Sequence, residues 1–325
     1  MGKIAFLFPG QASQYSGMGR EIYERFPTAK AVFDNADAAV GFPLSKLCFE
    51  GSEDDLKLTE NTQPAILAVS VAVYRLLTER DTMPDYVAGH SLGEYSALVA
   101  ADSLEFADAV RLVRNRGRYM QEAVPAGEGG MAAILGLAPG LVVEICKRAA
   151  DGEVLGPANL NAPQQTVVSG SAVAVKRAVE LASQSGAKRA VLLPVSAPFH
   201  CELMKPAEKR LEADLQRTKF CDLKFPLVTN VDAEAITSGE EARAALVRQV
   251  CQPVRWEESV REMIRLGVTF FLEVGPGRVL SGLVRQIDRS VRVANAEDEE
   301  SLTAALEKLA RERTADGEAE AEAEA

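Results

Sequence analysis

The sequence predicts an α/β protein in which a small unit is inserted into a larger one built on a mainly parallel sheet. Strand and helix patterns alternate up to residue 126, which indicates parallel strands with helices on both faces. The composition changes at "PAGEGG" (residues 125–130), and the βαββαβ order that follows is typical of a ferredoxin-like unit. We therefore expect a large subdomain from residues 1–126 and 196–313, and a small one from residues 127–195.

Each element has a local signal. The first strand is a buried apolar run closed by Pro9-Gly10, and Pro64 stands in the first turn of a long helix, where proline is tolerated. The large subdomain is expected to contain, in order, strand 3–8, helices 19–31 and 63–79, strand 85–90, helices 92–101, 104–123 and 202–217, strand 226–230, helices 239–250 and 256–266, strand 270–275 and helix 301–313. The small subdomain is expected to contain strand 131–137, helix 139–150, strands 153–160 and 164–170, helix 172–185 and strand 188–195.

Composition excludes several classes of protein. No apolar run is long enough to cross a membrane, and the N-terminus reads as a strand rather than a signal peptide. Five scattered cysteines without a Cys-x-x-Cys argue against disulfides or a zinc site and favour a reducing cytoplasm. The net charge of −11 argues against a nucleic-acid surface. Part of that acidity lies in residues 314–325, which cannot bury enough apolar surface to fold and are expected to be a disordered tail.

The stretch "VAGHSLGEYSALVA" (residues 87–100) places Ser91 in a Gly-x-Ser-x-Gly pattern between an expected strand and an expected helix. On such a sharp turn, Gly89 and Gly93 remove side chains that would clash, and the hydroxyl stands at the positive end of the helix. A serine that only caps a helix is the alternative. The strand before Ser91 and the helix after it favour a catalytic nucleophile.

The chain has two histidines, and only one is placed to act as a base. His90 precedes Ser91 on the same turn, so the two side chains diverge and His90 is expected to pack in the wall. His200 follows the serine in chain order, as in serine hydrolases with this turn, and we predict that it takes the proton of Ser91. Cys201 is a rival nucleophile, but sequence neighbours such as Cys201 and His200 cannot easily form a Cys–His pair, and no such turn surrounds the cysteine, so it is expected to be a buried small residue.

A hydrolytic triad also needs an acid that orients the histidine. Asp232 and Glu273 both follow His200 in the chain and are candidates, but neither is favoured by its pattern. The sequence leaves this role open, which weakens the interpretation as an ordinary esterase.

The helix expected over residues 104–123 carries four arginines, of which one faces inward. At about 100° per residue, Arg116 falls within the apolar stripe between Leu112 and Met120, while the other three face solvent. A buried cation needs an anionic partner. A structural ion pair with Glu105 is one possibility, and a substrate carboxylate held by both guanidinium nitrogens is the other.

The glycine-rich stretch "FPGQASQYSGMG" (residues 8–19) follows the first strand. It contains neither Gly-Lys-Ser/Thr nor Gly-x-Gly-x-x-Gly, which argues against a nucleotide-phosphate loop. A tight turn beside Ser91 can instead supply a second backbone N–H to an oxyanion hole, the first coming from Leu92.

Seven motifs occur in an order that resembles the malonyl-CoA:acyl carrier protein transacylases of bacterial type II fatty-acid synthesis. They are "FPGQASQYSGMG", "TQPAILA", "GHSLGEYSAL", "RGRYMQEA", "NLNAPQQTVVSG", "SAPFH" and "FLEVGPGRVLSGLV", and they span roughly residues 3–310. The resemblance implies an α/β-hydrolase-like core with an inserted ferredoxin-like subdomain. Ala12 is a departure, because the family often has glycine there, and it puts the conformation of that loop in doubt.

The resemblance also assigns roles to six positions. Those roles are nucleophile for Ser91, base for His200, malonyl-carboxylate ligand for Arg116, oxyanion-hole N–H donors for Gln11 and Leu92, and a backbone carbonyl that orients the histidine for Gln249. The expected activity is ping-pong transfer of malonyl from malonyl-CoA to the phosphopantetheine thiol of acyl carrier protein, through a malonyl-serine. No metal or other cofactor is expected, and the protein is expected to be a monomer. The alternatives are a serine esterase or thioesterase, a malonyl loader for a polyketide synthase, and a non-catalytic scaffold.

Overall fold

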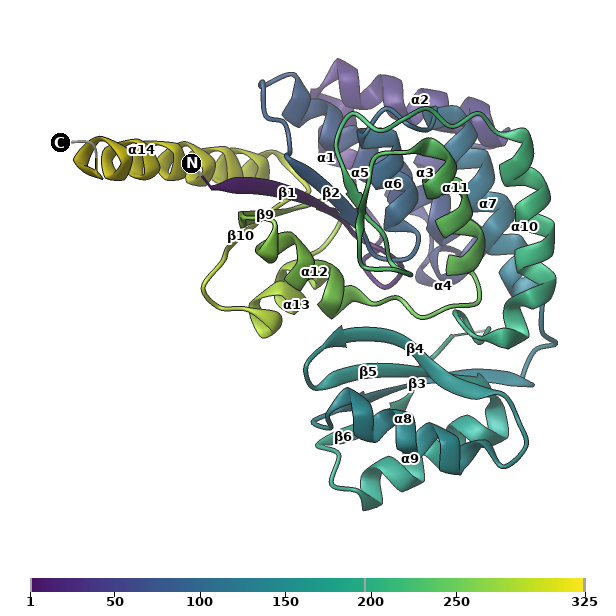
Figure 1. Ribbon diagram of the computed structural model, residues 1–325. Coiled ribbons are helices and arrows are strands. Elements are labelled where there is room, and N and C mark those ends of the chain that lie inside the picture. Colours follow the sequence, from purple (N-terminus) through teal and green to yellow (C-terminus); the bar gives the residue numbers. More distant parts are fainter. Residues whose placement is uncertain (1, 196, 324–325) are drawn as a thin grey trace.

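The computed structural model describes residues 2–195 and 197–323, with the backbone alone from residue 312 onward. Two sheets organise these residues (Figure 1). The larger has six strands in the order β10-β9-β1-β2-β7-β8, and the smaller has four in the order β4-β5-β3-β6. The predicted α/β class, with a parallel sheet and a separate small antiparallel one, is confirmed.

The large sheet is parallel except at one edge, where the short strand β8 runs antiparallel to β7. Its strands are β1 (Lys3–Phe8), β2 (Tyr86–Gly89), β7 (Leu227–Val228), β8 (Ala235–Ile236), β9 (Val268–Val274) and β10 (Arg292–Ala296). Alternate residues of β1 enter different cores, because successive side chains of a strand point to opposite faces. Phe6 and Phe8 join one cluster, and Ala5 and Leu7 join the other.

Helices cover both faces of this sheet. The face of Phe6 and Phe8 packs against α1 (Arg20–Arg25), α2 (Pro27–Val40), α3 (Leu44–Glu50), α4 (Glu53–Lys57), α5 (Thr59–Thr78), α6 (Gly93–Ala100), α7 (Phe106–Glu122), α10 (Lys205–Arg217), α11 (Gly239–Gln249) and α14 (Glu299–Ala323). The opposite face packs against α12 (Trp256–Arg265) and α13 (Val279–Ile287). Both faces of the parallel sheet are thus buried, which explains why its strands read as continuous apolar runs.

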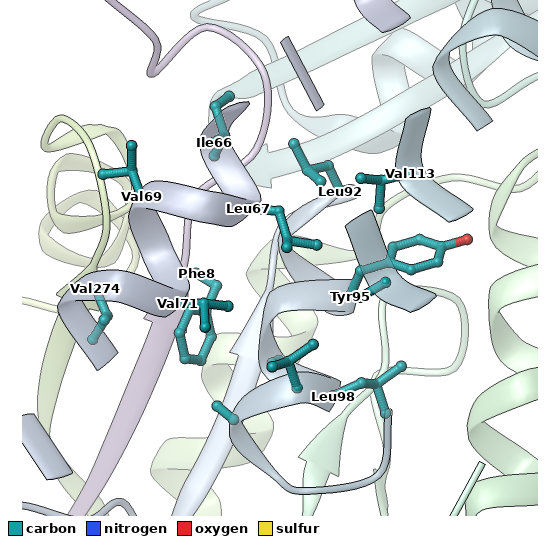
Figure 2. Packing of buried hydrophobic residues seen from close by; sticks show 14 of the residues in the cluster. Phe8, Ile66, Leu67, Val69, Val71, Leu92, Tyr95, Leu98, Val113 and Val274 are labelled. Carbon is teal, nitrogen blue, oxygen red and sulfur yellow. The ribbon is translucent and has the colours of Figure 1, made fainter. Parts of the chain in front are cut away.

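The larger cluster joins the helices that carry the functional residues. Figure 2 draws Phe8 of β1, Leu67 of α5, Leu92 and Tyr95 at the start of α6, and Val113 of α7 in one cluster. All five side chains are fully buried. Helices α5, α6 and α7 therefore share one close-packed core and hold fixed positions relative to each other.

The small sheet has the predicted βαββαβ order. Its elements are β3 (Gly129–Leu135), α8 (Pro139–Ala150), β4 (Leu155–Ala162), β5 (Gln165–Ser171), α9 (Ala172–Gln184) and β6 (Arg189–Leu192). All neighbouring strands are antiparallel, and α8 and α9 cover one face. From the other face, Met131 and Val167 join the core of the large sheet. The subdomain limits of 127–195 stay a prediction.

Several elements differ from the sequence-based expectation. The helix expected over residues 19–31 is two helices, because Phe26 is extended before Pro27 and that proline begins α2. The elements α3, α4, α13, β8 and β10 were not predicted. Most of them are short, and β8 and β10 lie at the two edges of the large sheet, where the apolar pattern is weak.

The acidic tail also differs from expectation. Helix α14 continues through residues 314–323, which were expected to be disordered, and it extends away from the body in Figure 1. Its first turns are anchored in the core by Leu302, Ala305 and Leu309. Once such a nucleus exists, each further residue adds to a helix at little cost, and alanine and glutamate are strong helix formers. Residues 324–325 lie outside the described part of the chain.

Removing residues 314–325 should therefore change the free energy of unfolding by less than about 0.5 kcal/mol, since the core contacts of α14 come earlier. The matched change at the packed end, Leu302→Ala, should cost about 2–5 kcal/mol, because this side chain is 1% exposed. Urea denaturation followed by tryptophan fluorescence measures both. A truncation that costs more than about 1 kcal/mol would mean that the tail packs on the body.

Candidate active site

Ser91 lies on a sharp turn between β2 and α6, with a left-handed backbone (φ 52°) that is uncommon outside glycine. The two flanking glycines make this turn possible. A Cβ on Gly89 would lie 1.9 Å from the carbonyl carbon of Gly93, and a Cβ on Gly93 would lie 2.0 Å from the carbonyl oxygen of Phe8. Neither position can hold a side chain. This is the reason for the two glycines that the sequence pattern indicated.

A buried asparagine holds both sides of this turn. Asn230 Oδ1 accepts a 2.7 Å hydrogen bond from the backbone N–H of Ser91, and Asn230 Nδ2 donates a 2.7 Å bond to the carbonyl of Gly89. The backbone N–H of Asn230 in turn donates to the buried carboxylate of Glu94 at 2.8 Å. Sequence reasoning missed Asn230. Its signal was a polar residue at the end of the strand pattern "PLVTN".

His200 is the histidine that meets the serine. Its Nε2 lies 2.8 Å from Ser91 Oγ, and its Nδ1 lies 2.8 Å from the backbone carbonyl oxygen of Gln249. A carbonyl only accepts hydrogen bonds, so Nδ1 carries the proton and the unprotonated Nε2 faces the serine hydroxyl. The tautomer required of a general base is therefore fixed by the main chain.

The two candidate acids lie elsewhere. The buried carboxylate of Glu273 accepts hydrogen bonds from the backbone N–H groups of Leu280 (2.9 Å) and Ser281 (2.7 Å), so it caps the start of α13. Asp232 forms an ion pair with Arg248, with an N···O distance of 2.6 Å. Neither carboxylate is hydrogen-bonded to His200.

His90 and Cys201 are packed in the wall around Ser91 and His200. Nε2 of His90 lies 2.8 Å from Asn161 Oδ1, in the small sheet, and the imidazole ring lies against Trp256 with ring centroids 5.5 Å apart. Cys201 donates from Sγ to the carbonyl oxygen of Pro198 at 3.1 Å, and burial raises the pKa of its thiol. A thiol with a raised pKa is a poor nucleophile at neutral pH.

The environment of His200 strongly favours the neutral imidazole. Burial lowers its pKa from 6.5 to about 3, and the positive charge of Arg116 is the second cause. His90 adds a smaller lowering, while hydrogen bonds to the backbone of Gln249 and Gln252 act in the opposite direction. In the free protein His200 is therefore unprotonated at neutral pH and able to accept a proton.

Arg116 is 1% exposed and lies beside the same serine. Its Nη2 donates to Ser91 Oγ at 2.9 Å and to Gln249 Oε1 at 3.0 Å, and its Nη1 donates to Gln63 Oε1 at 2.8 Å. No carboxylate forms an ion pair with it among the described residues, and Glu105 is exposed. The structural ion pair considered from the sequence is therefore not formed, and the cation has only neutral partners.

Close contact between α5 and α7 brings this arginine to the site. A Cβ on Gly117 would lie 2.5 Å from the backbone oxygen of Thr59, so α7 approaches the start of α5 at the residue next to Arg116. Gln63, whose Oε1 accepts the hydrogen bond from Arg116 Nη1, lies on the first turns of α5 and is fully buried. Sequence reasoning did not assign it a role. A polar residue directly before Pro64 in an apolar helix was the available signal.

The backbone N–H groups of Gln11, after β1, and of Leu92, after the serine, have no hydrogen-bond acceptor in the described part of the chain. The loop of Gln11 packs on the serine turn, since a Cβ on Gly10 would lie 2.5 Å from the carbonyl oxygen of His90. Ala12, where the sequence left the loop conformation in doubt, is left-handed with φ 81°. Free donors beside a nucleophile are what an oxyanion hole requires.

The arrangement can carry out covalent acyl transfer on an acyl group that has its own negative charge. It holds a hydroxyl, a neutral base with a fixed tautomer, two free N–H donors and a buried cation without a counter-ion. No group of three or more His, Cys, Asp or Glu side chains that could hold a metal ion was found in residues 2–195 and 197–311.

The chain matches the family described as "Acyl transferase domain" over residues 5–319. It is 49% identical to the malonyl CoA-acyl carrier protein transacylase of Bacillus subtilis (strain 168) over 313 residues, which cover 96% of this chain and 99% of that protein. It is 46% identical to the protein of the same name from Escherichia coli (strain K12) over 308 residues, which cover 94% of this chain and 100% of that protein.

Solved structures are similar over nearly the same length. An acyl carrier protein S-malonyltransferase from Vibrio cholerae has a TM-score of 0.91 and 44% identity, covering 93% of this chain and 99% of that chain. A malonyl-transacylase in complex with its type II PKS acyl-carrier protein has a TM-score of 0.92 and 45% identity, covering 94% of this chain and 99% of that chain.

The pKa of His200 leads to a prediction for the free protein. A base must be neutral to act, and the imidazole is neutral above its pKa of about 3. The rate at which phenylmethanesulfonyl fluoride inactivates Ser91 should therefore stay level down to about pH 5, instead of halving near pH 6.5. Arg116→Ala should move the acid limb to higher pH, because one cause of the lowering is removed. A midpoint near pH 6.5 in the unchanged protein would contradict the assigned environment.

The left-handed backbone of Ala12 leads to a stability prediction. An L-residue is strained there, so Ala12→Gly should raise the free energy of unfolding by up to about 1 kcal/mol. The same change at Ala31, an exposed position within α2, should lower it by about 1 kcal/mol. Thermal unfolding compares the two variants. Equal destabilisation by both would mean that Ala12 is not strained.

Proposed function

Because this chain belongs to the acyl transferase domain family, we propose that it transfers the malonyl group of malonyl-CoA to the phosphopantetheine thiol of an acyl carrier protein. The resemblance that seven sequence motifs indicated is confirmed by the family match. One observation carries the substrate assignment: the buried Arg116 guanidinium, which lacks an acidic partner, lies 2.9 Å from the Ser91 hydroxyl. A malonyl group has a carboxylate one carbon away from the carbonyl that the serine would attack, so both ends fit this pair of residues.

In the first half-reaction Ser91 Oγ attacks the thioester carbonyl while His200 Nε2 takes the hydroxyl proton. The backbone N–H groups of Gln11 and Leu92 stabilise the negative oxygen that forms. Each such donor typically contributes about 3–4 kcal/mol to lowering the barrier. The C–S bond then breaks, and His200 returns the proton to the leaving CoA thiolate.

The second half-reaction runs the same steps in reverse. His200 accepts the proton of the carrier's phosphopantetheine thiol, and the thiolate attacks the malonyl-serine ester. The carbonyl of Gln249 keeps the imidazole in the same tautomer through both halves, since Nδ1 donates to it at 2.8 Å. His200 then returns the proton to Ser91, and the free enzyme is restored.

Arg116 is proposed to select the acyl group. Its guanidinium would hold the malonyl carboxylate by two N–H donors, as guanidinium groups do with carboxylates. An acetyl group would leave the buried charge without an anion. A site built in this way can discriminate between the two by a factor of about 10⁴.

The same proposal covers the location, the oligomeric state, the cofactors and the ligands of the protein. We propose a cytoplasmic monomer without a metal or other cofactor that binds malonyl-CoA and acyl carrier protein. Within the described residues, no helix has the length and apolar character to span a membrane. A loader for a polyketide synthase would use the same residues with another carrier, whereas an esterase would release free malonate.

The experiment that tests this function adds labelled malonyl-CoA to the protein and identifies the products with and without holo acyl carrier protein. The expected result is a stable malonyl-enzyme labelled at Ser91, which is converted to malonyl-carrier when the carrier is added. Ser91→Ala should form no labelled enzyme, while Ser96→Ala, which changes a buried serine on the helix that follows Ser91, should still be labelled. Free malonate as the main product would indicate hydrolysis, and a label that survives in Ser91→Ala would place the nucleophile elsewhere.

A further inference from the structure

The hydroxyl of Ser91 has two hydrogen-bond partners in the free protein, and one of them is a cation. It donates to His200 Nε2 at 2.8 Å and accepts from Arg116 Nη2 at 2.9 Å. A hydrogen bond from a charged donor is about twice as strong as one between neutral groups. It also withdraws electron density from the oxygen that must attack, so the resting serine is a weakened nucleophile.

The same guanidinium acts on the base. Its positive charge is the second cause, after burial, of the low pKa of His200. Glu94 and Tyr95 are the ionisable groups that act on Arg116 in turn, and neither is hydrogen-bonded to the guanidinium. All hydrogen-bond partners of the guanidinium are neutral, so its positive charge acts on both Ser91 and His200.

We propose that the carboxylate of the incoming acyl group activates Ser91 by drawing the Arg116 guanidinium away from its hydroxyl. This inference rests on the proposed function and adds to it a step that precedes chemistry. The malonyl group thereby activates the nucleophile that attacks it. With an acyl group that has no carboxylate, the hydrogen bond from Arg116 to the serine oxygen remains.

The contacts of Arg116 make this exchange favourable. Its partners are a hydroxyl and two amide oxygens, from Ser91, Gln63 and Gln249, and its Nε has no partner among the described residues. A carboxylate is a stronger acceptor than any of these, and it removes the unbalanced charge from the buried site. Gln63 and Gln249 can keep their bonds to the guanidinium while the bond to Ser91 is exchanged.

The activated step balances as the transfer itself does. The Ser91 Oγ–carbonyl bond forms and the thioester C–S bond breaks. The hydroxyl proton passes to His200 Nε2 and from there to the CoA thiolate. The carboxylate is neither formed nor consumed, because it only changes the hydrogen bond that the serine oxygen accepts.

A chemical complementation experiment tests this inference. Acetyl-CoA and formate together carry the acyl carbon atoms and the carboxylate of a malonyl group as two separate molecules. Formation of the acetyl-enzyme from acetyl-CoA is followed by intact-protein mass spectrometry at increasing formate concentrations, with chloride keeping the ionic strength constant. Formate should accelerate acetylation of Ser91 by about tenfold or more, the effect expected from releasing one charge-assisted hydrogen bond.

Two variants test whether the effect of formate acts through Arg116. Arg116→Ala should acetylate faster than the unchanged protein in the absence of formate, and formate should have no further effect. Arg111→Ala removes an exposed arginine from the same helix and should respond to formate as the unchanged protein does. Thermal unfolding of each variant shows that it is folded.

Formate that slows acetylation, or leaves it unchanged, in the unchanged protein would overturn the inference and leave Arg116 as a binding residue only. Acceleration that persists in Arg116→Ala would assign the effect to another group and overturn it as well. Both outcomes are separate from failure of the proposed function, because labelling of Ser91 by malonyl-CoA is measured without formate.

Discussion

A buried guanidinium without a counter-ion is the interaction on which this site depends. Moving a charge out of water costs several kcal/mol unless hydrogen bonds and an opposite charge compensate for it. In this protein Gln63, Ser91 and Gln249 supply three neutral oxygens to Arg116, and no carboxylate completes the set. The protein therefore holds a charge that is only partly compensated, and in the proposed function the carboxylate of the acyl group supplies the missing anion. On that proposal, substrate selection and the electrostatics of Ser91 and His200 have one physical origin.

The rest of the fold holds this charge in place. The left-handed backbones of Ser91 and His200 are individually unfavourable and persist only where the surrounding structure determines them. Asn230 supplies that constraint on one side by bonding to the chain before and at the serine. Close packing of α5 against α7 fixes the helix that carries Arg116, at the residue next to it. The elements that meet at the site come from distant parts of the chain, and each is fixed by the common core.

The sequence allowed prediction of those residues whose chemistry leaves a local signature. Ser91 stands between two glycines, His200 is one of only two histidines, and Arg116 interrupts an apolar stripe. Asn230 and Gln63 leave only a weak signal, a polar residue in an apolar pattern, because the role of a buried polar residue depends on a partner that is far away in the chain. For Asn230 and Ser91 that separation is 139 residues. The short helices and edge strands escaped prediction for a related reason: their stability comes from the core that they complete rather than from their own pattern.

The acceptor that orients His200 is a main-chain carbonyl, and this has a consequence for how such a site tolerates sequence change. An acidic third member can be lost through a single codon change, but a peptide oxygen is present whichever amino acid occupies position 249. The acceptor for His200 thus depends on the path of the backbone, and it is kept when a point mutation changes the side chain at position 249. The side chain at that position remains free to serve Arg116 and Ser91. Comparisons of active sites that align only side chains will find two members here and overlook the third.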